Sequence, residues 1–257
     1  MPGVERSPGA GRGVKPTGGR PLSAAHLRDV IATGEMRLLG LLPRASNYTF
    51  LCEVSGGPGT VLCVYKPRDG ETPLWDFPEG SLHRREVAAF VLADRLGWPA
   101  VPVTVLRDGP HGPGSVQLFV QADPQEHFFT MREARLEAFR PVAAFDFVVN
   151  NADRKSGHCL SGDGGQIWSV DHGVCFAAEP KLRTVIWDFA GERLPEDLCA
   201  DISRLAVELD AGALRQTMLG LLSRREVDAT AARARALVGA GRFPVPSSSR
   251  AYPWPPV

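Results

Sequence analysis

The chain has 257 residues, of which 44% are hydrophobic, and its 29 basic residues equal its 29 acidic residues. This composition supports a folded core and argues against a globally disordered chain. The zero net charge argues against a nonspecific nucleic-acid binder and against a polybasic membrane anchor. No apolar run reaches the roughly 18 residues that would predict a membrane-spanning helix.

Five cysteines are present, and none belongs to a Cys-x-x-Cys pair. An odd number without such pairs argues against a disulfide framework and against a zinc ribbon. The N-terminus also lacks the apolar core of a secretion signal. We therefore predict a cytoplasmic protein.

Both ends of the chain differ in composition from the middle. Residues 1–22 are rich in glycine, proline and arginine without apolar periodicity, and we predict that they are disordered. Residues 243–257 form a proline-rich tail. We expect this tail to be a polyproline II arm that docks Tyr252 and Trp254 on the body of the protein.

Between these ends, strand signals dominate residues 23–120 and helical periodicity dominates residues 121–242. The predicted elements are strands over 48–54 and 60–66 with a turn at 56–59, a helix over 81–96, strands over 101–106 and 115–121, a helix over 141–150, one or two helices over 195–222, and a helix over 223–239. This order predicts the α+β class, with a β-rich N-lobe, a helical C-lobe and a cleft between them.

Local capping signals define several helix ends. Ser81 is a candidate N-cap, and Gly97 is a candidate stop for the same helix. Ser223 and Glu226 have the spacing of a capping box at the start of the last helix.

Lys66 ends the second predicted strand, where period-two alternation places it on the same face as Val64 and Leu62. A buried ammonium group needs a partner, and Glu86 on the following helix can supply one. Kinase-type sites use such a Lys–Glu pair to hold the lysine against nucleotide phosphates. A lysine that extends to solvent and a solvated glutamate fit the same local patterns.

A polar loop over 150–158 joins an apolar helix to a short apolar strand. Asp153 lies five positions before His158, which is the spacing of Asp-x-x-x-x-Asn in phosphotransferase catalytic loops. In those loops the aspartate orients the attacking hydroxyl and the asparagine holds a magnesium ion. An ordinary polar surface loop is the alternative.

Asp171 ends a short strand and is followed by His172 and Gly173. Its distance in sequence from Asp153 suits a β-hairpin that returns the carboxylate to the first loop. Asp171 would then be a hard oxygen ligand for magnesium. A simple turn at a hairpin end is the alternative.

The segments 151–158 and 170–176 together resemble the catalytic and metal-binding loops of the phosphatidylinositol 3- and 4-kinase superfamily. Within that superfamily, the pattern of residues most resembles the type II 4-kinases and HipA-like kinases. They also resemble a mainly actinobacterial family of small proteins related to those kinases. The similarity covers about residues 40–190. It implies a two-lobed protein-kinase-like fold, ATP with Mg²⁺ or Mn²⁺ as cofactors, and transfer of the γ-phosphate to a hydroxyl acceptor.

The same resemblance implies roles for single residues. Asp153 would be the catalytic aspartate, Asp171 and His158 the metal ligands, and Lys66 the phosphate-binding residue that Glu86 positions.

Two further segments would contact ATP by this resemblance. A loop over 44–50 would cover the phosphates through Ser46 and Asn47. An interlobe hinge would bind adenine through Phe119, Val120 and Gln121.

Two features depart from the family pattern: the phosphate loop lacks a run of glycines, and His158 stands where asparagine is usual. Magnesium prefers oxygen ligands, whereas His158 offers a ring nitrogen. This difference leaves three interpretations: the site binds manganese, His158 has another role, or the second metal is lost. A nucleotide-binding pseudokinase that acts as a sensor or scaffold is therefore the alternative function. A hydrolytic metal site that adds His172 is a further alternative, but the spacing of these histidines matches no such motif.

The acceptor is not defined by the sequence. Related kinases contact their substrate through the segment that corresponds to 173–184, where Lys181 and Arg183 are the nearby cations. A polyphosphorylated inositol headgroup would require more positive charge. Protein and small-molecule hydroxyls therefore remain open, and a protein partner is possible.

Overall fold

The computed structural model describes residues 24–43, 47–57, 59–162, 165–246 and 250–257. The predicted disorder of residues 1–22 and the predicted role of Ser46 lie outside the described residues. The described helices and strands are α1 (Ala24–Thr33), β1 (Glu35–Leu41), β2 (Phe50–Gly56), β3 (Gly59–Pro67), η1 (Arg68–Gly70), α2 (Leu82–Leu96), β4 (Thr104–Gly109), β5 (Gly112–Leu118), α3 (Phe128–Arg135), η2 (Leu136–Phe139), α4 (Arg140–Val149), η3 (Ser156–His158), β6 (Cys159–Ser161), β7 (Ile167–Ser169), α5 (Glu196–Asp210), α6 (Ala213–Leu219) and α7 (Arg224–Ala240).

The N-terminal half is built on an antiparallel sheet of five strands in the order β1-β2-β3-β5-β4. The predicted hairpin is present as β2 and β3, which pair with Phe50 opposite Tyr65. Cys63 and Tyr65 point to a small core that also contains Ile31 of α1. Because side chains alternate along a strand, Lys66 lies on the opposite face of the sheet.

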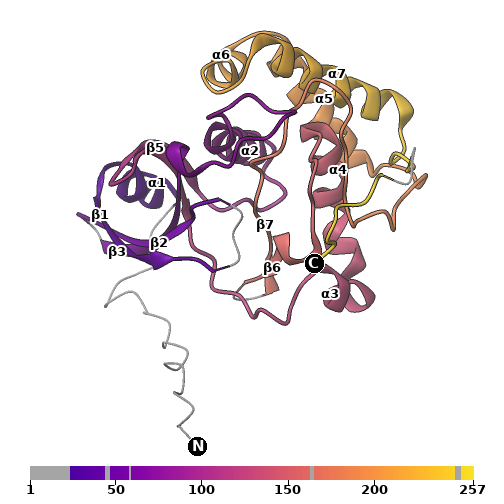
Figure 1. Cartoon of the computed structure of the whole chain (residues 1–257). Coiled ribbons are helices and arrows are strands. Elements are labelled where there is room, and N and C mark those ends of the chain that lie inside the picture. The colour runs from indigo at the N-terminus through magenta and orange to yellow at the C-terminus, as the bar shows by residue number, and fades with distance from the viewer. Residues whose placement is uncertain (1–23, 44–46, 58, 163–164, 247–249) are drawn as a thin grey trace, which may run out of the picture.

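The C-terminal half is mostly helical, with α4, α5 and α7 around a larger core (Figure 1). The one or two helices predicted over 195–222 are present as two, α5 and α6. The predicted capping box is present, since Ser223 N–H donates to Glu226 Oε2 at 2.9 Å and Glu226 N–H donates to Ser223 Oγ at 3.4 Å. The α+β class, with a strand-rich N-terminal half and a helical C-terminal half, agrees with the sequence prediction.

The sheet ends at Leu118 and α3 begins at Phe128, so the predicted lobe boundary at 120–121 falls in the connection between them. The short hairpin of β6 and β7 lies between the sheet and the large helices (Figure 1). Within the described residues, no helix combines the length and the apolar character needed to cross a membrane. The sequence reasoning did not predict α1, β1 or α3.

Two local predictions need correction. Gly97 does end α2 in a left-handed conformation, but the side chain of Ser81 does not cap this helix and donates to Pro78 O instead. The proline-rich tail does dock on the body, but not through Tyr252 and Trp254, which are 53% and 87% exposed. The buried residues in the described part of the tail are instead Phe243, Ala251 and Pro253.

Candidate active site

A cavity of about 520 Å³ lies where the two halves meet. Its walls come from the inner face of β3, the start of α2, the segment after β5, and the loops on either side of the β6–β7 hairpin. The predicted site residues that line it are Asn47, Lys66, Glu86, Phe119, Val120, Asp153, His158 and Asp171. Gln121 does not line this cavity.

Lys66 is held by two carboxylates in this cavity. Its Nζ contacts Glu86 Oε1 and donates to Asp171 Oδ1 at 2.9 Å. Burial by itself would lower the pKa of Lys66, but the negative charges of Asp171 and Glu86 outweigh burial and raise it. Lys66 is therefore a fixed positive charge at neutral pH, and not a lysine that extends to solvent.

Glu86 is buried, with a side chain that is 3% exposed. Besides contacting Lys66, its Oε2 accepts the backbone N–H of His172 at 2.9 Å. One carboxylate thus joins β3, α2 and the segment that follows β7. This arrangement makes the position of Lys66 depend on the position of α2.

Asp171 has a left-handed backbone conformation, with φ of 60°, which aspartate tolerates better than bulky residues do. The positive charge of Lys66 lowers the pKa of Asp171 well below its usual range, against the effect of burial. Its side chain is 49% exposed, so the ionised carboxylate is open to the cavity.

His158 faces Asp171, with 3.2 Å between His158 Nε2 and Asp171 Oδ2. Burial lowers the pKa of His158 to about 4, so the imidazole is neutral at pH 7. The backbone N–H of Lys155 points at His158 Nδ1 at 3.4 Å, which leaves the proton on Nε2. In this tautomer His158 donates to Asp171, and it needs the other tautomer to bind a metal through Nε2.

Asp171 and His158 are the side chains of this site that could hold a divalent cation. Among the residues that the structure describes, no three His, Cys, Asp or Glu side chains gather into a metal-binding group. Mg²⁺ commonly binds through one or two carboxylates, substrate phosphates and water. The donors Asp171 and His158 suit that arrangement better than a metal cage built by protein side chains alone.

Asp153 lies in the loop between α4 and η3 and lines the same cavity. Asn151 Oδ1 accepts the Asp153 N–H at 3.0 Å and so shapes the loop. Burial raises the pKa of Asp153, and Lys155 Nζ, 3.5 Å from Asp153 Oδ2, opposes this rise. A half-buried carboxylate with a raised pKa is suited to accept a proton.

Arg154 is the residue of this loop that the sequence reasoning missed. Its guanidinium is fully buried and binds Asp146 of α4, with 2.9 Å between Nη2 and Oδ1. The same group donates to the carbonyl oxygens of His158 at 3.2 Å and Val170 at 2.7 Å. Arg154 thus joins the loop of Asp153 to the segment just before Asp171, and an arginine between two polar residues gave no sequence signal for that role.

His172 does not line the cavity that contains Lys66, Asp153 and Asp171. Its ring is fully buried, and its Nε2 lies 2.8 Å from Arg154 Nη2, so this nitrogen accepts a hydrogen bond. Burial lowers the pKa of His172 well below its ordinary value. A hydrolytic metal site that uses both histidines therefore has no geometric support.

The predicted nucleotide contacts are partly occupied by contacts within the protein. Phe119 N–H donates to Leu62 O at 2.9 Å, so this amide is not available to adenine. Asn47 Oδ1 accepts the N–H of Thr72 at 2.7 Å, although Asn47 still lines the cavity.

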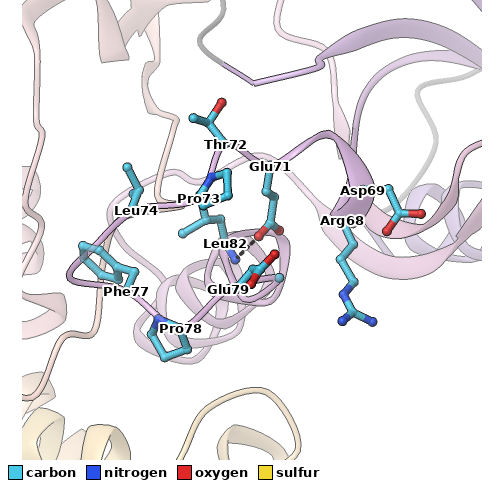
Figure 2. A pocket seen from close by; sticks show the side chains of 11 residues that line it. Arg68, Asp69, Glu71, Thr72, Pro73, Leu74, Phe77, Pro78, Glu79 and Leu82 are labelled. Carbon is cyan, nitrogen blue, oxygen red and sulfur yellow. Dashed lines mark hydrogen bonds between the residues drawn. The ribbon is translucent and has the colours of Figure 1, made fainter.

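A second, smaller hollow of about 270 Å³ adjoins the cavity, and Glu71 lines both (Figure 2). Glu71 points at the start of α2, where it accepts the N–H of Leu82 at 3.0 Å and of His83 at 2.8 Å. Glu71 therefore caps the helix that carries Glu86, in place of Ser81. Its position eleven residues before Leu82 hides this role from capping rules that look only at adjacent residues.

This fold is of the protein-kinase-like class. Solved structures of the Golgi casein kinase have the same fold. One has a TM-score of 0.52 at 13% identity and covers 87% of this chain and 80% of that chain. The form with Mn/ADP bound has a TM-score of 0.54 at 15% identity, and the match covers 91% of this chain and 80% of that chain.

The particular family is shown by sequence. The chain is 39% identical to Protein Rv2133c of Mycobacterium tuberculosis over 271 aligned residues. The alignment covers 90% of this chain and 97% of that protein, and the chain belongs to the same family. It is also 26% identical to phosphatidylinositol 4-kinase gamma 4 of Oryza sativa subsp. japonica, over 78% of this chain and 45% of the rice protein. The chain therefore spans less than half of that relative. No family model matches the chain.

Proposed function

We propose that this protein is an ATP-dependent phosphotransferase of the phosphatidylinositol 3-/4-kinase-like type, which moves the γ-phosphate to a hydroxyl acceptor. The observation that carries the proposal is one cavity lined by Lys66, Asp153 and Asp171, which come from three distant segments. The rice 4-kinase and the ADP-bound casein kinase support the same class of reaction.

In this reaction the acceptor oxygen forms a bond to the γ-phosphorus, and the bond from phosphorus to the bridging oxygen breaks, so that ADP leaves. Asp153 orients the acceptor hydroxyl and takes its proton. Lys66, positioned by Glu86, offsets charge on the phosphate oxygens.

The remaining residues bind the cofactors. Asp171 and His158 would hold Mg²⁺ or Mn²⁺, which offsets phosphate charge when bound. Phe119 and Val120 would contact adenine, and Asn47 would lie near the phosphates together with Ser46, which is outside the described residues.

The charges near the acceptor side argue for an acceptor with few phosphate groups. Lys181 Nζ is paired with Asp76 Oδ2 at 2.6 Å, and its side chain is mostly buried. This lysine is therefore not available to a highly charged headgroup, whose recognition would need several unpaired cations.

Replacing Asp153 by asparagine tests the proposal. Asparagine keeps the size of the side chain but cannot accept a proton, so turnover should fall by about 10²- to 10⁴-fold. The affinity for ATP, measured by calorimetry, should stay close to that of the native protein because Asp153 does not hold the nucleotide. The surface variant Asp210→Asn is the control and should keep full turnover. ATP binding without any turnover in the native protein would contradict the proposal and favour a pseudokinase.

Replacing His158 by asparagine tests the metal role of this residue. An amide oxygen suits Mg²⁺ better than an imidazole does, so the ratio of Mg²⁺-supported to Mn²⁺-supported turnover should rise. Steady-state rates with each metal measure this ratio. An unchanged ratio with a lower rate for both metals would show that His158 acts only by donating to Asp171.

A further inference from the structure

The C-terminal segment 251–257 contacts both the active-site loop, at Ser156, and the separate segment 184–187. Ala251 O accepts the backbone N–H of Thr184 at 3.0 Å and the indole N–H of Trp187 at 3.1 Å. Pro256 O accepts the backbone N–H of Ser156 at 2.9 Å. Ser156 is fully buried and lies between Asp153 and His158.

These contacts extend a short backbone ladder that already includes Arg154. Arg154 N–H donates to Arg183 O at 3.0 Å, and Val185 N–H donates to Arg154 O at 3.1 Å. Thr184, between those two residues, directs its own N–H outward to Ala251. The C-terminal segment is thus hydrogen-bonded to Thr184, which pairs with Arg154 of the loop, and through Pro256 O to Ser156 of the same loop.

The side chains of the segment show how it is held. Ala251 is 5% exposed, whereas its neighbour Tyr252 points largely to solvent. Proline lacks an N–H group, so a proline-rich arm binds through its carbonyl oxygens, and all three of these contacts use carbonyl acceptors of the segment. Its attachment therefore uses backbone carbonyl groups and the buried Ala251 and Pro253, and not the exposed side chains of Tyr252 and Trp254.

We propose that the segment 251–257 is a positioning element for the catalytic loop, which it holds in place through Ser156 and Thr184. The link to turnover rests on the proposed phosphotransferase function. The segment does not touch the substrate, and it acts through the loop that presents Asp153. Release of the segment therefore loosens the loop while the nucleotide contacts of Lys66 persist.

The test compares two full-length variants that add the same charge at adjacent positions. Ala251→Asp places a carboxylate in a buried position and should release the segment, whereas Tyr252→Asp places it at an exposed position and should not. Ala251→Gly keeps the carbonyl and the space, and should behave as the native protein does. Hydrogen exchange measures the protection of the Ser156 and Thr184 amides, and steady-state kinetics with Mg²⁺ and ATP measure turnover.

We expect faster exchange at both amides and a fall in kcat of about 10- to 100-fold in Ala251→Asp, with the KM for ATP nearly unchanged. Equal exchange in Ala251→Asp and Tyr252→Asp would overturn the proposal. Faster exchange with unchanged kcat would overturn its link to turnover. If the native protein shows no turnover at all, the proposed function fails, and the exchange result still decides whether the segment holds the loop.

Discussion

Replacing Asp171 by asparagine is expected to reduce ATP turnover by about 10³-fold or more, because the carboxylate is the principal hard ligand that the cavity offers to a divalent cation. Asp171 is open to the cavity, and its pKa is lowered by Lys66, so it is a fully ionised ligand at neutral pH. Asparagine preserves the shape of the side chain but removes the charge. Metal-dependent ADP release, measured over a range of Mg²⁺ and Mn²⁺ concentrations, gives the size of the loss.

Asp228→Asn is the matched control for this experiment. Asp228 lies on α7 with a side chain that is 53% exposed, pairs with the mostly buried Arg215, and does not line the cavity. This variant should keep native turnover with both metals. Native turnover in Asp171→Asn would remove the metal site from the proposal.

Replacing Arg154 by methionine is expected to lower the free energy of unfolding by about 3–5 kcal/mol, because it leaves the buried Asp146 carboxylate without its partner. Both side chains are fully buried. The loss is a large share of the stability of a typical domain, which is about 5–15 kcal/mol. Chemical denaturation followed by circular dichroism measures it.

Two further variants distinguish the cost of leaving Asp146 unpaired from the cost of simply losing a charge. Arg154→Met combined with Asp146→Asn removes the unpaired charge and should recover part of the lost stability. Arg204→Met breaks a half-exposed pair with Asp201 and should cost no more than about 1 kcal/mol. A loss in Arg154→Met that is as small as in Arg204→Met would show that the buried pair does not stabilise the fold.

Features that depend on adjacent residues could be predicted from the sequence. The β2–β3 hairpin follows from alternation on both sides of a glycine-rich turn, the end of α2 from Gly97, and the start of α7 from Ser223 and Glu226. The spacing of Asp153 and Asp171 around a short hairpin also sufficed to predict that the two carboxylates share one cavity. In each case the interacting groups are close in sequence, so local geometry leaves few arrangements.

Features that depend on distant partners were decided by the tertiary structure alone. Glu71 caps α2 across a loop, and the Phe119 N–H donates to Leu62 of β3. Arg154 binds Asp146 of α4 on one side and two loop carbonyl oxygens on the other. The tail binds the body through the carbonyl oxygen of Ala251. The sequence by itself determined which residues carry charge and that the β2–β3 hairpin, α2, α4 and α7 form around them. Which of those charges become buried, and with which partner, depended on how the two halves pack, because desolvation and pairing energies exist only once both groups leave water.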